Sequence, residues 1–191
     1  MKHIYGIAVA CGLLVSSCGG KKTATVEEEQ QRVLQIDSVD AASGVQRMKV
    51  SQYNEDVTIG GRAYHIAITR EPDDAAPTVK SEVGTYVDNK VTLRISRADG
   101  SEWVNRTVRK SDFAAIMGDS YTRHFILEGL VYDEERTQNE NRPVFATSIS
   151  VPMTDLYIPF IARVNASGQL EIVRDEDMDV LPQIDEEKTA E

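Results

Sequence analysis

The stretch "KVTLRISRADGSEWVNRTVRK", residues 90–110, alternates apolar and polar side chains on either side of a turn sequence. Val91, Leu93 and Ile95 recur at every second position, which is typical of a strand with one buried face. Asp99-Gly100 supplies the turn chemistry, because glycine adopts a positive φ without a steric cost. The chain then returns as a second strand. The stretch therefore predicts an antiparallel β-hairpin.

Strand-like runs continue outward from this hairpin in both directions. Gly60-Gly61 separates two runs on the N-terminal side, and "NASG", residues 165–168, separates the last two runs of the chain. Residues 71–86 form a long connection. Pro159 lacks an N–H group, so its strand is expected at a sheet edge or beside a bulge. The flanking runs expected as strands are 45–59, 62–70, 124–133, 143–151, 155–164 and 169–174.

One short helix is expected over "SDFAAIMG", residues 111–118, with Ser111 capping its start and Gly118 ending it. On its expected inner face lie Phe113, Ile116 and Met117. Together these patterns predict a mainly β protein, an antiparallel meander of about eight strands that is barrel-like or a sandwich, with one short helix. The aromatic residues expected in the core are Trp103, Phe113, Phe125, Tyr132, Phe145, Tyr157 and Phe160.

The chain of 191 residues is long enough for one domain, expected over residues 45–174. Its net charge is -10, and residues 175–191 hold eight acidic residues and one lysine. That segment is therefore expected to be an acidic C-terminal tail, while the domain itself is close to neutral. An anionic chain repels phosphate backbones, so nucleic acid is not an expected partner.

The N-terminus has the pattern of a lipoprotein signal peptide over residues 1–17. Its apolar run is shorter than the roughly 20 residues that span a bilayer. It ends in Val15-Ser16-Ser17-Cys18, which resembles the bacterial lipobox, in which the cysteine thiol takes a diacylglycerol. Cys18 is therefore the predicted lipidation site, residues 18–44 are an anchor and flexible tether, and the membrane is a partner through this lipid. The alternative is a secreted protein whose Cys18 only lies near a cleavage site.

The predicted location is the bacterial cell envelope, at the outer membrane. In Bacteroidota-like bacteria, acidic residues directly after the lipidated cysteine can direct a lipoprotein to the cell surface. Here Lys21 and Lys22 come first and the acidic residues 27–29 come later. An orientation towards the periplasm is therefore favoured over surface exposure.

Candidate sites for chemistry are few. His65 and His124 lie on polar positions, and the patterns GxSxG, HExxH, CxxC and the phosphate loop are absent from the sequence, so no catalytic residue and no cofactor is predicted. Asp37-Ser38-Val39 resembles an O-glycosylation acceptor of Bacteroidota, with an ordinary turn as the favoured alternative.

The acidic tail has a spacing found in calcium loops. Asp175, Asp177, Asp179 and Glu186 fall at positions 1, 3, 5 and 12, but Val180 stands where the loop needs glycine. Chance is the favoured explanation, and no metal site is predicted.

Three stretches carry a resemblance to a known family: "YVDNKVTLRISRADGSEWVNRT", "ILEGLVYD" and "DLYIPFIARVNASGQLEIVRD". With the lipobox, they resemble the small Bacteroidota lipoproteins catalogued as domain of unknown function 4738. The resemblance covers roughly residues 45–175. It implies no activity and no site residues, because none is established for that family.

The favoured function is a lipid-anchored envelope lipoprotein that acts as a non-enzymatic binding or interaction module. The alternative is a lipocalin-like carrier of a small apolar ligand, and a third hypothesis is an enzyme that uses only Asp, Glu, Ser, Tyr or Arg. An interior filled by side chains would favour the first hypothesis, and an open apolar cavity would favour the second.

Overall fold

The computed structural model describes residues 36–177, in which twelve strands form three four-stranded sheets. The sheet built around the hairpin of residues 90–110 is antiparallel throughout, in the order β3-β4-β7-β8. We call it sheet B. Its strands are β3 (Ser51–Ile59), β4 (Arg62–Pro72), β7 (Asn89–Arg97) and β8 (Glu102–Arg109).

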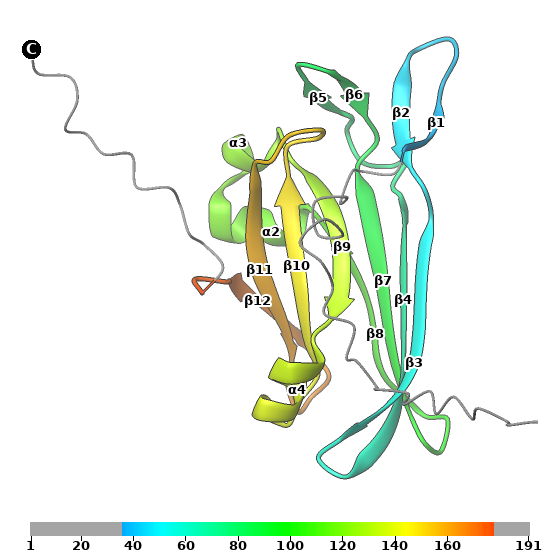
Figure 1. The fold of residues 1–191 in the computed structure, drawn as a ribbon, viewed down its shortest axis with the longest axis vertical. Helices are drawn as coiled ribbons and strands as arrows, with labels where there is room; N and C mark the ends of the chain where they lie inside the picture. The colour runs from blue at the N-terminus through cyan, green and yellow to red at the C-terminus, as the bar shows by residue number, and fades with distance from the viewer. Residues whose placement is uncertain (1–35, 178–191) are drawn as a thin grey trace, which may run out of the picture. The chain divides into compact units, whose positions relative to one another are not determined.

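The second sheet, sheet C, is also antiparallel and runs in the order β12-β11-β10-β9 (Figure 1). Its strands are β9 (Ile126–Tyr132), β10 (Val144–Ser150), β11 (Tyr157–Val164) and β12 (Leu170–Arg174). Sheets B and C pack face to face, because the alternating apolar residues of both sheets share one core. The mainly β prediction is confirmed, with the sandwich rather than the barrel-like arrangement. Seven of the eight predicted strands occur in these two sheets, while the predicted run 45–59 is divided: residues 45–48 join the third sheet and residues 51–59 form β3.

The third sheet, sheet A, was not predicted. It contains β1 (Ile36–Val39), β2 (Val45–Met48), β5 (Val79–Ser81) and β6 (Gly84–Tyr86), in the order β1-β2-β6-β5. β2 and β6 pair in parallel, so the fold is not a pure antiparallel meander. Two of its strands lie in the connection 71–86, and β1 lies within the range expected as a tether.

The hairpin of residues 90–110 forms as predicted. Val91, Leu93 and Ile95 are fully buried. Gly100 has a φ of 82°, and its N–H donates to the Arg97 carbonyl at 2.9 Å. A bulge between Ile95 and Ser96 accommodates the turn.

The structure corrects the prediction of one helix. Residues 36–177 contain α2 (Ser111–Met117), α3 (Asp119–Thr122) and α4 (Glu134–Glu140). Ser111 does not cap α2, since the cap position is Lys110 and makes no side-chain cap bond. Gly118 does end the helix, and Phe113 is buried, but Ile116 is exposed.

Helix α4 was missed because its sequence, "EERTQNE", has no apolar face. Caps and ion pairs hold it instead. The Asp133 carboxylate accepts a bond from the Arg136 N–H at 2.9 Å, and Arg136 in turn pairs with Asp175 at 2.7 Å. At its other end, Glu140 accepts from Arg163 of sheet C at 2.9 Å.

Of two expectations about single residues, one holds in part and one is wrong. Pro159 lies in β11, an interior strand of sheet C and not an edge, but its partner Ser148 borders the bulge between Ser148 and Ile149. Its carbonyl accepts from the Asp175 N–H beyond the end of β12. The nitrogen of Pro159 faces the same side and has no hydrogen to donate in return, which fits the end of β12 at Arg174. Tyr157, expected in the core, is exposed, whereas Tyr86 is buried in the small core of sheet A.

Candidate functional site

The three sheets meet at one end of the molecule around the buried carboxylate of Asp88. One Asp88 oxygen accepts from the backbone N–H of Asn89 at 2.8 Å and of Leu127 at 2.9 Å. The other lies 2.9 Å from the Lys110 ammonium, which also donates to the Phe125 carbonyl at 2.8 Å. Asp88 follows sheet A, Asn89 begins β7 of sheet B, and Leu127 belongs to β9 of sheet C. One carboxylate therefore contacts the junction of all three sheets.

A second buried carboxylate, Asp73, fixes the loop between β4 and β5. It accepts from the Arg109 guanidinium at 2.9 Å, and its own N–H donates to the Asp88 carbonyl at 2.8 Å. Its backbone and side-chain oxygens also accept from Ala76 and Ala75. The loop is thereby tied to sheet B on one side and to the Asp88 junction on the other.

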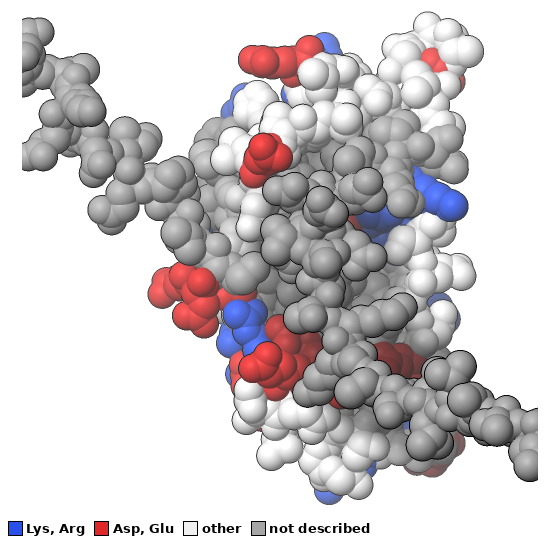
Figure 2. Space-filling model, in the orientation of Figure 1, with Lys and Arg blue, Asp and Glu red and all other residues white. Residues whose placement is uncertain are grey.

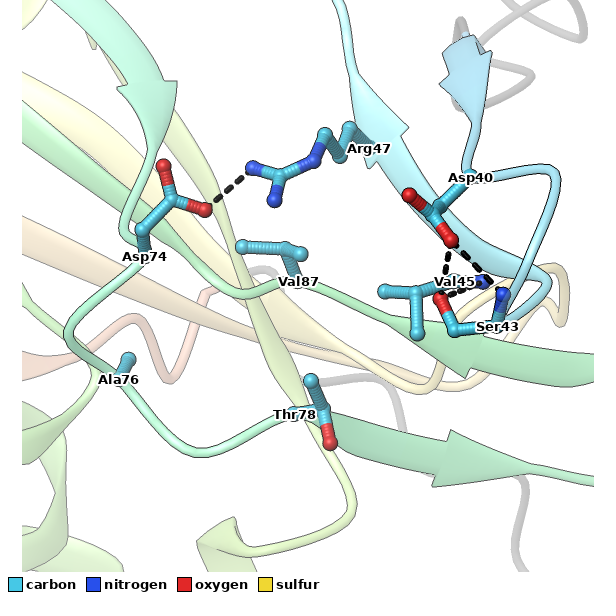
Figure 3. A pocket seen from close by; sticks show the side chains of 8 residues that line it. All are labelled: Asp40, Ser43, Val45, Arg47, Asp74, Ala76, Thr78 and Val87. Atoms are coloured by element: carbon cyan, nitrogen blue, oxygen red, sulfur yellow. Dashed lines mark hydrogen bonds and ion pairs between the residues drawn. The ribbon is translucent and has the colours of Figure 1, made fainter.

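Beside this loop lies a hollow of about 220 Å³ that is open on one side. Figure 3 shows Arg47 and Asp74 facing each other across it, with Asp40 and Ser43 together at the other side. The Ser43 hydroxyl donates to Asp40 at 2.7 Å, and this bond is the main reason why the pKa of Asp40 lies below its ordinary value. Its lining residues are Asp40, Ser43, Val45, Arg47, Asp74, Ala76, Thr78 and Val87.

The polar groups of the hollow are therefore already engaged with one another. Arg47 is paired with Asp74, and Asp40 with Ser43. The hollow does not enclose a small apolar molecule, because it is open and half polar.

Three hairpin ends around this junction expose large apolar side chains, and we call them the apolar tips. They carry Val39 at 57%, Val83 at 60%, and Met153, Leu156 and Tyr157 at about half exposure. Figure 1 shows all three ends in its upper part. Sheet A is held at this end of sheet C because Ile126 of sheet C packs with residues of β5 and β6 in the small core of sheet A.

Each apolar tip also carries an acidic residue. Asp40 follows β1, Glu82 lies between β5 and β6, and Asp155 lies between β10 and β11; all three are exposed. Figure 2 accordingly shows red atoms beside white ones at the upper end of the molecule. Met153, in the third tip, has a φ of 61°, a conformation that few residues other than glycine adopt.

The predicted modification sites are placed as follows. Cys18 lies outside the described residues. Ser38 is exposed in β1, the edge strand of sheet A, opposite Arg47.

Of the candidate calcium ligands, Asp175 is paired with a cation of the protein itself. Asp175 is buried, and both of its carboxylate oxygens accept from Arg136, at 2.7 and 3.2 Å. Asp179 and Glu186 lie outside the described residues. Within 36–177 there is no group of three His, Cys, Asp or Glu side chains that could hold a metal ion.

The strand register brings Asp56, His65 and Ser96 into one row across sheet B. His65 Nδ1 lies 2.7 Å from Asp56 Oδ1, and these two side chains are 48% and 90% exposed. An acid, a histidine and a serine are the groups of a hydrolytic triad. Here, however, the acid and the histidine are open to water, which screens their interaction. His124 is exposed elsewhere, beside Phe125.

Sequence reasoning did not find Asp88 or Lys110, although a signal existed. A hairpin centred on Asp99-Gly100 places residue 89 opposite residue 110, so a charge at position 88 lies near a lysine at the open end of the hairpin. The backbone N–H of Leu127, the third partner, could not be foreseen because it depends on how sheet C packs.

A family model with the description "Domain of unknown function (DUF4738)" matches residues 29–172. The match spans every described strand except the end of β12, and so includes Asp88, the hollow and the apolar tips. No curated protein matches the chain. In the stretch 36–177, no helix has the length and apolar character needed to cross a bilayer.

Proposed function

Since the chain belongs to the family described as Domain of unknown function (DUF4738), whose description names no activity, we propose that it is a lipid-anchored lipoprotein of the Bacteroidota envelope that serves as a non-enzymatic binding module. The lipid is carried by Cys18, at the end of the lipobox pattern. The folded domain is held at the outer membrane and faces the periplasm. There it docks on another envelope protein through the apolar tips.

The filled interior supports a binding module over a carrier. Phe113, Phe145 and Phe160 are at most 1% exposed and lie in one cluster with the apolar faces of sheets B and C. The Phe113 and Phe160 rings contact each other edge to face, with centroids 4.8 Å apart. A lipocalin-like carrier needs an open apolar cavity in this place.

The observation that carries the proposal is the apolar tips. Large apolar side chains on loops at one end of a fold are typical of an interaction surface. The exposed acids Asp40, Glu82 and Asp155 beside them favour a partner with an apolar centre and a basic rim. They disfavour an anionic lipid surface, which would repel them.

Site-specific photo-crosslinking in the native bacterium tests the docking surface. A photoreactive residue at Leu156 or Val83 should give the same discrete, protease-sensitive adduct. The matched control is Val173, which is also exposed but lies on sheet C away from the tips. Adducts with lipid only, or the same adduct from Val173, would contradict the proposal.

A second variant tests whether the Met153 side chain, and not only an intact fold, is needed for the contact. Met153→Asn keeps a residue that tolerates positive φ but removes the apolar side chain. We expect the thermal midpoint to stay within a few degrees while the adduct from Leu156 is lost. Retention of the adduct would place the contact elsewhere.

Lipidation is tested separately by feeding labelled palmitate. The wild-type protein should carry the label and partition into detergent, and Cys18→Ser should do neither. The reverse result would remove the anchor from the proposal without affecting the docking surface.

The Asp56–His65–Ser96 row supplies the test for an enzyme. A fluorophosphonate probe labels activated serines, and we expect none here. Labelling that is lost in Ser96→Ala but kept in Ser101→Ala would replace the binding module by a hydrolase.

A further inference from the structure

Strand β3 forms one edge of sheet B over its whole length. It pairs with β4 from Ser51, opposite Arg70, to Ile59, opposite Arg62, and no strand of the described part pairs with its other side. Residues 51–56 are all exposed. In an antiparallel strand, alternate residues turn their N–H and C=O groups away from the partner. The Thr58 carbonyl, near the end of β3, accepts from Gln138 of α4 at 3.0 Å, so the open backbone edge is that of residues 51–56.

The inner face of β3 is exposed over its first six residues, 51–56. The register places Tyr53 and Glu55 on the same face as Ile68 and Ile66 of β4. The two isoleucines are buried, but Tyr53 and Glu55 are exposed. Figure 1 shows β3 on the side of sheet B away from β9–β12. A strand added to this edge would therefore meet a half-open face that bears an aromatic ring and a carboxylate.

Glu55 stands at the centre of the nine residues of β3. A charge that points inward on an edge strand opposes unselective pairing of edges. If a second copy paired antiparallel about this centre, Glu55 would lie opposite Glu55 of the other copy, and like charges in that position destabilise the pair. A segment with a basic residue opposite Glu55 would instead form a stabilising pair of opposite charges there.

We infer that β3 is a docking edge for a strand-forming segment of a partner protein that places a lysine or arginine opposite Glu55. The incoming segment adds a fifth strand to sheet B through backbone hydrogen bonds. Glu55 selects its charge, and Tyr53 offers apolar contact on the same face. This interface lies apart from the apolar tips and does not depend on them.

The test uses the full-length protein and two nine-residue peptides, TTVTKTVTT and TTVTETVTT, which differ only in the central charge. Fluorescence anisotropy should show that the lysine peptide binds about fivefold or more tightly than the glutamate peptide, as expected for an opposite against a like cross-strand pair. Hydrogen exchange should show new protection in residues 51–59.

Two variants make the test specific. Glu55→Lys, an exposed position whose folding is checked by the thermal midpoint, should reverse the preference between the peptides. Glu176→Lys changes the net charge equally at an exposed position after β12 of sheet C and should leave the preference unchanged. No binding, equal binding of both peptides, an unchanged preference in Glu55→Lys, or protection at the opposite edge β8 would overturn the inference. Concentration-dependent protection of residues 51–59 without peptide would replace it by self-pairing.

Discussion

Two glycines in equivalent turns occupy the same backbone conformation in different surroundings. Gly100 and Gly168 have φ values of 82° and 81°, and the N–H of each donates to the carbonyl three residues before it. A Cβ on Gly100 would meet open space. A Cβ on Gly168 would lie 2.6 Å from the Trp103 carbonyl oxygen. The turn of sheet C is thus packed directly against β8 of sheet B.

The pair separates backbone strain from steric overlap. Gly100→Ala should destabilise the protein by about 1–2 kcal/mol, the usual cost of a Cβ at positive φ. Gly168→Ala should cost clearly more, because backbone atoms must also move. Thermal unfolding measures both, at about 2–4 °C for each kcal/mol in a chain of this size. Equal shifts would mean that the turn of residues 165–168 moves away from Trp103 without cost.

Glu140 links α4 to sheet C and gives stability a dependence on pH. Hydrogen bonds from Arg163, and then from Arg142, hold the pKa of Glu140 below its ordinary value of 4.5. A lowered pKa contributes stability above pH 4.5 that is lost as the pH falls through the folded-state value.

Glu140→Gln should therefore be less stable than wild type at pH 7, by about 0.2–1 kcal/mol for such a partly exposed group. The difference should shrink as the pH falls below about 4. Urea unfolding at several pH values measures it. Glu135→Gln, exposed on the same helix, is the control and should show no such trend.

At the scale of elements, what could be predicted followed from local pattern. The alternation of apolar and polar residues predicted strands of sheets B and C, and turn glycines predicted the hairpins at residues 60, 100 and 168. Helix α4 was not predicted because a cap and ion pairs stabilise it. Its one buried residue, Thr137, is polar, so its sequence shows no apolar stripe of helical period. The prediction that Ser111 caps α2 was wrong. At the start of this helix the Asp112 carboxylate accepts from the Arg109 N–H at 2.8 Å instead.

The two helix starts can be compared by mutation. Asp133→Ala removes the side chain that caps α4 and should destabilise the protein by about 1 kcal/mol. Ser111→Ala removes no cap bond and should change stability by less than about 0.5 kcal/mol. Denaturant midpoints at constant m-value decide between them. A larger loss in Ser111→Ala would restore the cap that the sequence suggested.

At the scale of the whole molecule, sequence reasoning left a barrel-like fold and a sandwich open and did not predict sheet A. β4 and β7 pair although β5 and β6 lie between them in the chain, and β2 pairs in parallel with β6. Strands of three or four residues are too short for an alternation of apolar and polar residues to be recognised. Two parallel strands are also not joined by a tight turn, so no turn sequence marks the pair. The candidate site was missed for the same reason, since the hollow and the Asp88 junction exist only where sheet A joins the others.

The Asp88 junction has a consequence for how the protein melts. Its carboxylate contacts groups that belong to separate sheets. A small apolar cluster also joins sheet A to sheet C, and the Asn89 amide donates to both Met48 Sδ and the Leu127 carbonyl. We therefore expect Asp88 to make the unfolding of the sheets cooperative. Asp88→Asn leaves the Lys110 charge buried without its partner and should cost about 3–5 kcal/mol. Calorimetry should then give a calorimetric enthalpy above the van't Hoff enthalpy, because sheet A melts before the sandwich.

Asp74→Asn, which breaks an exposed ion pair beside the Asp88 junction, should keep the two enthalpies equal. A single transition in Asp88→Asn would mean that apolar packing alone makes the three sheets one thermodynamic unit.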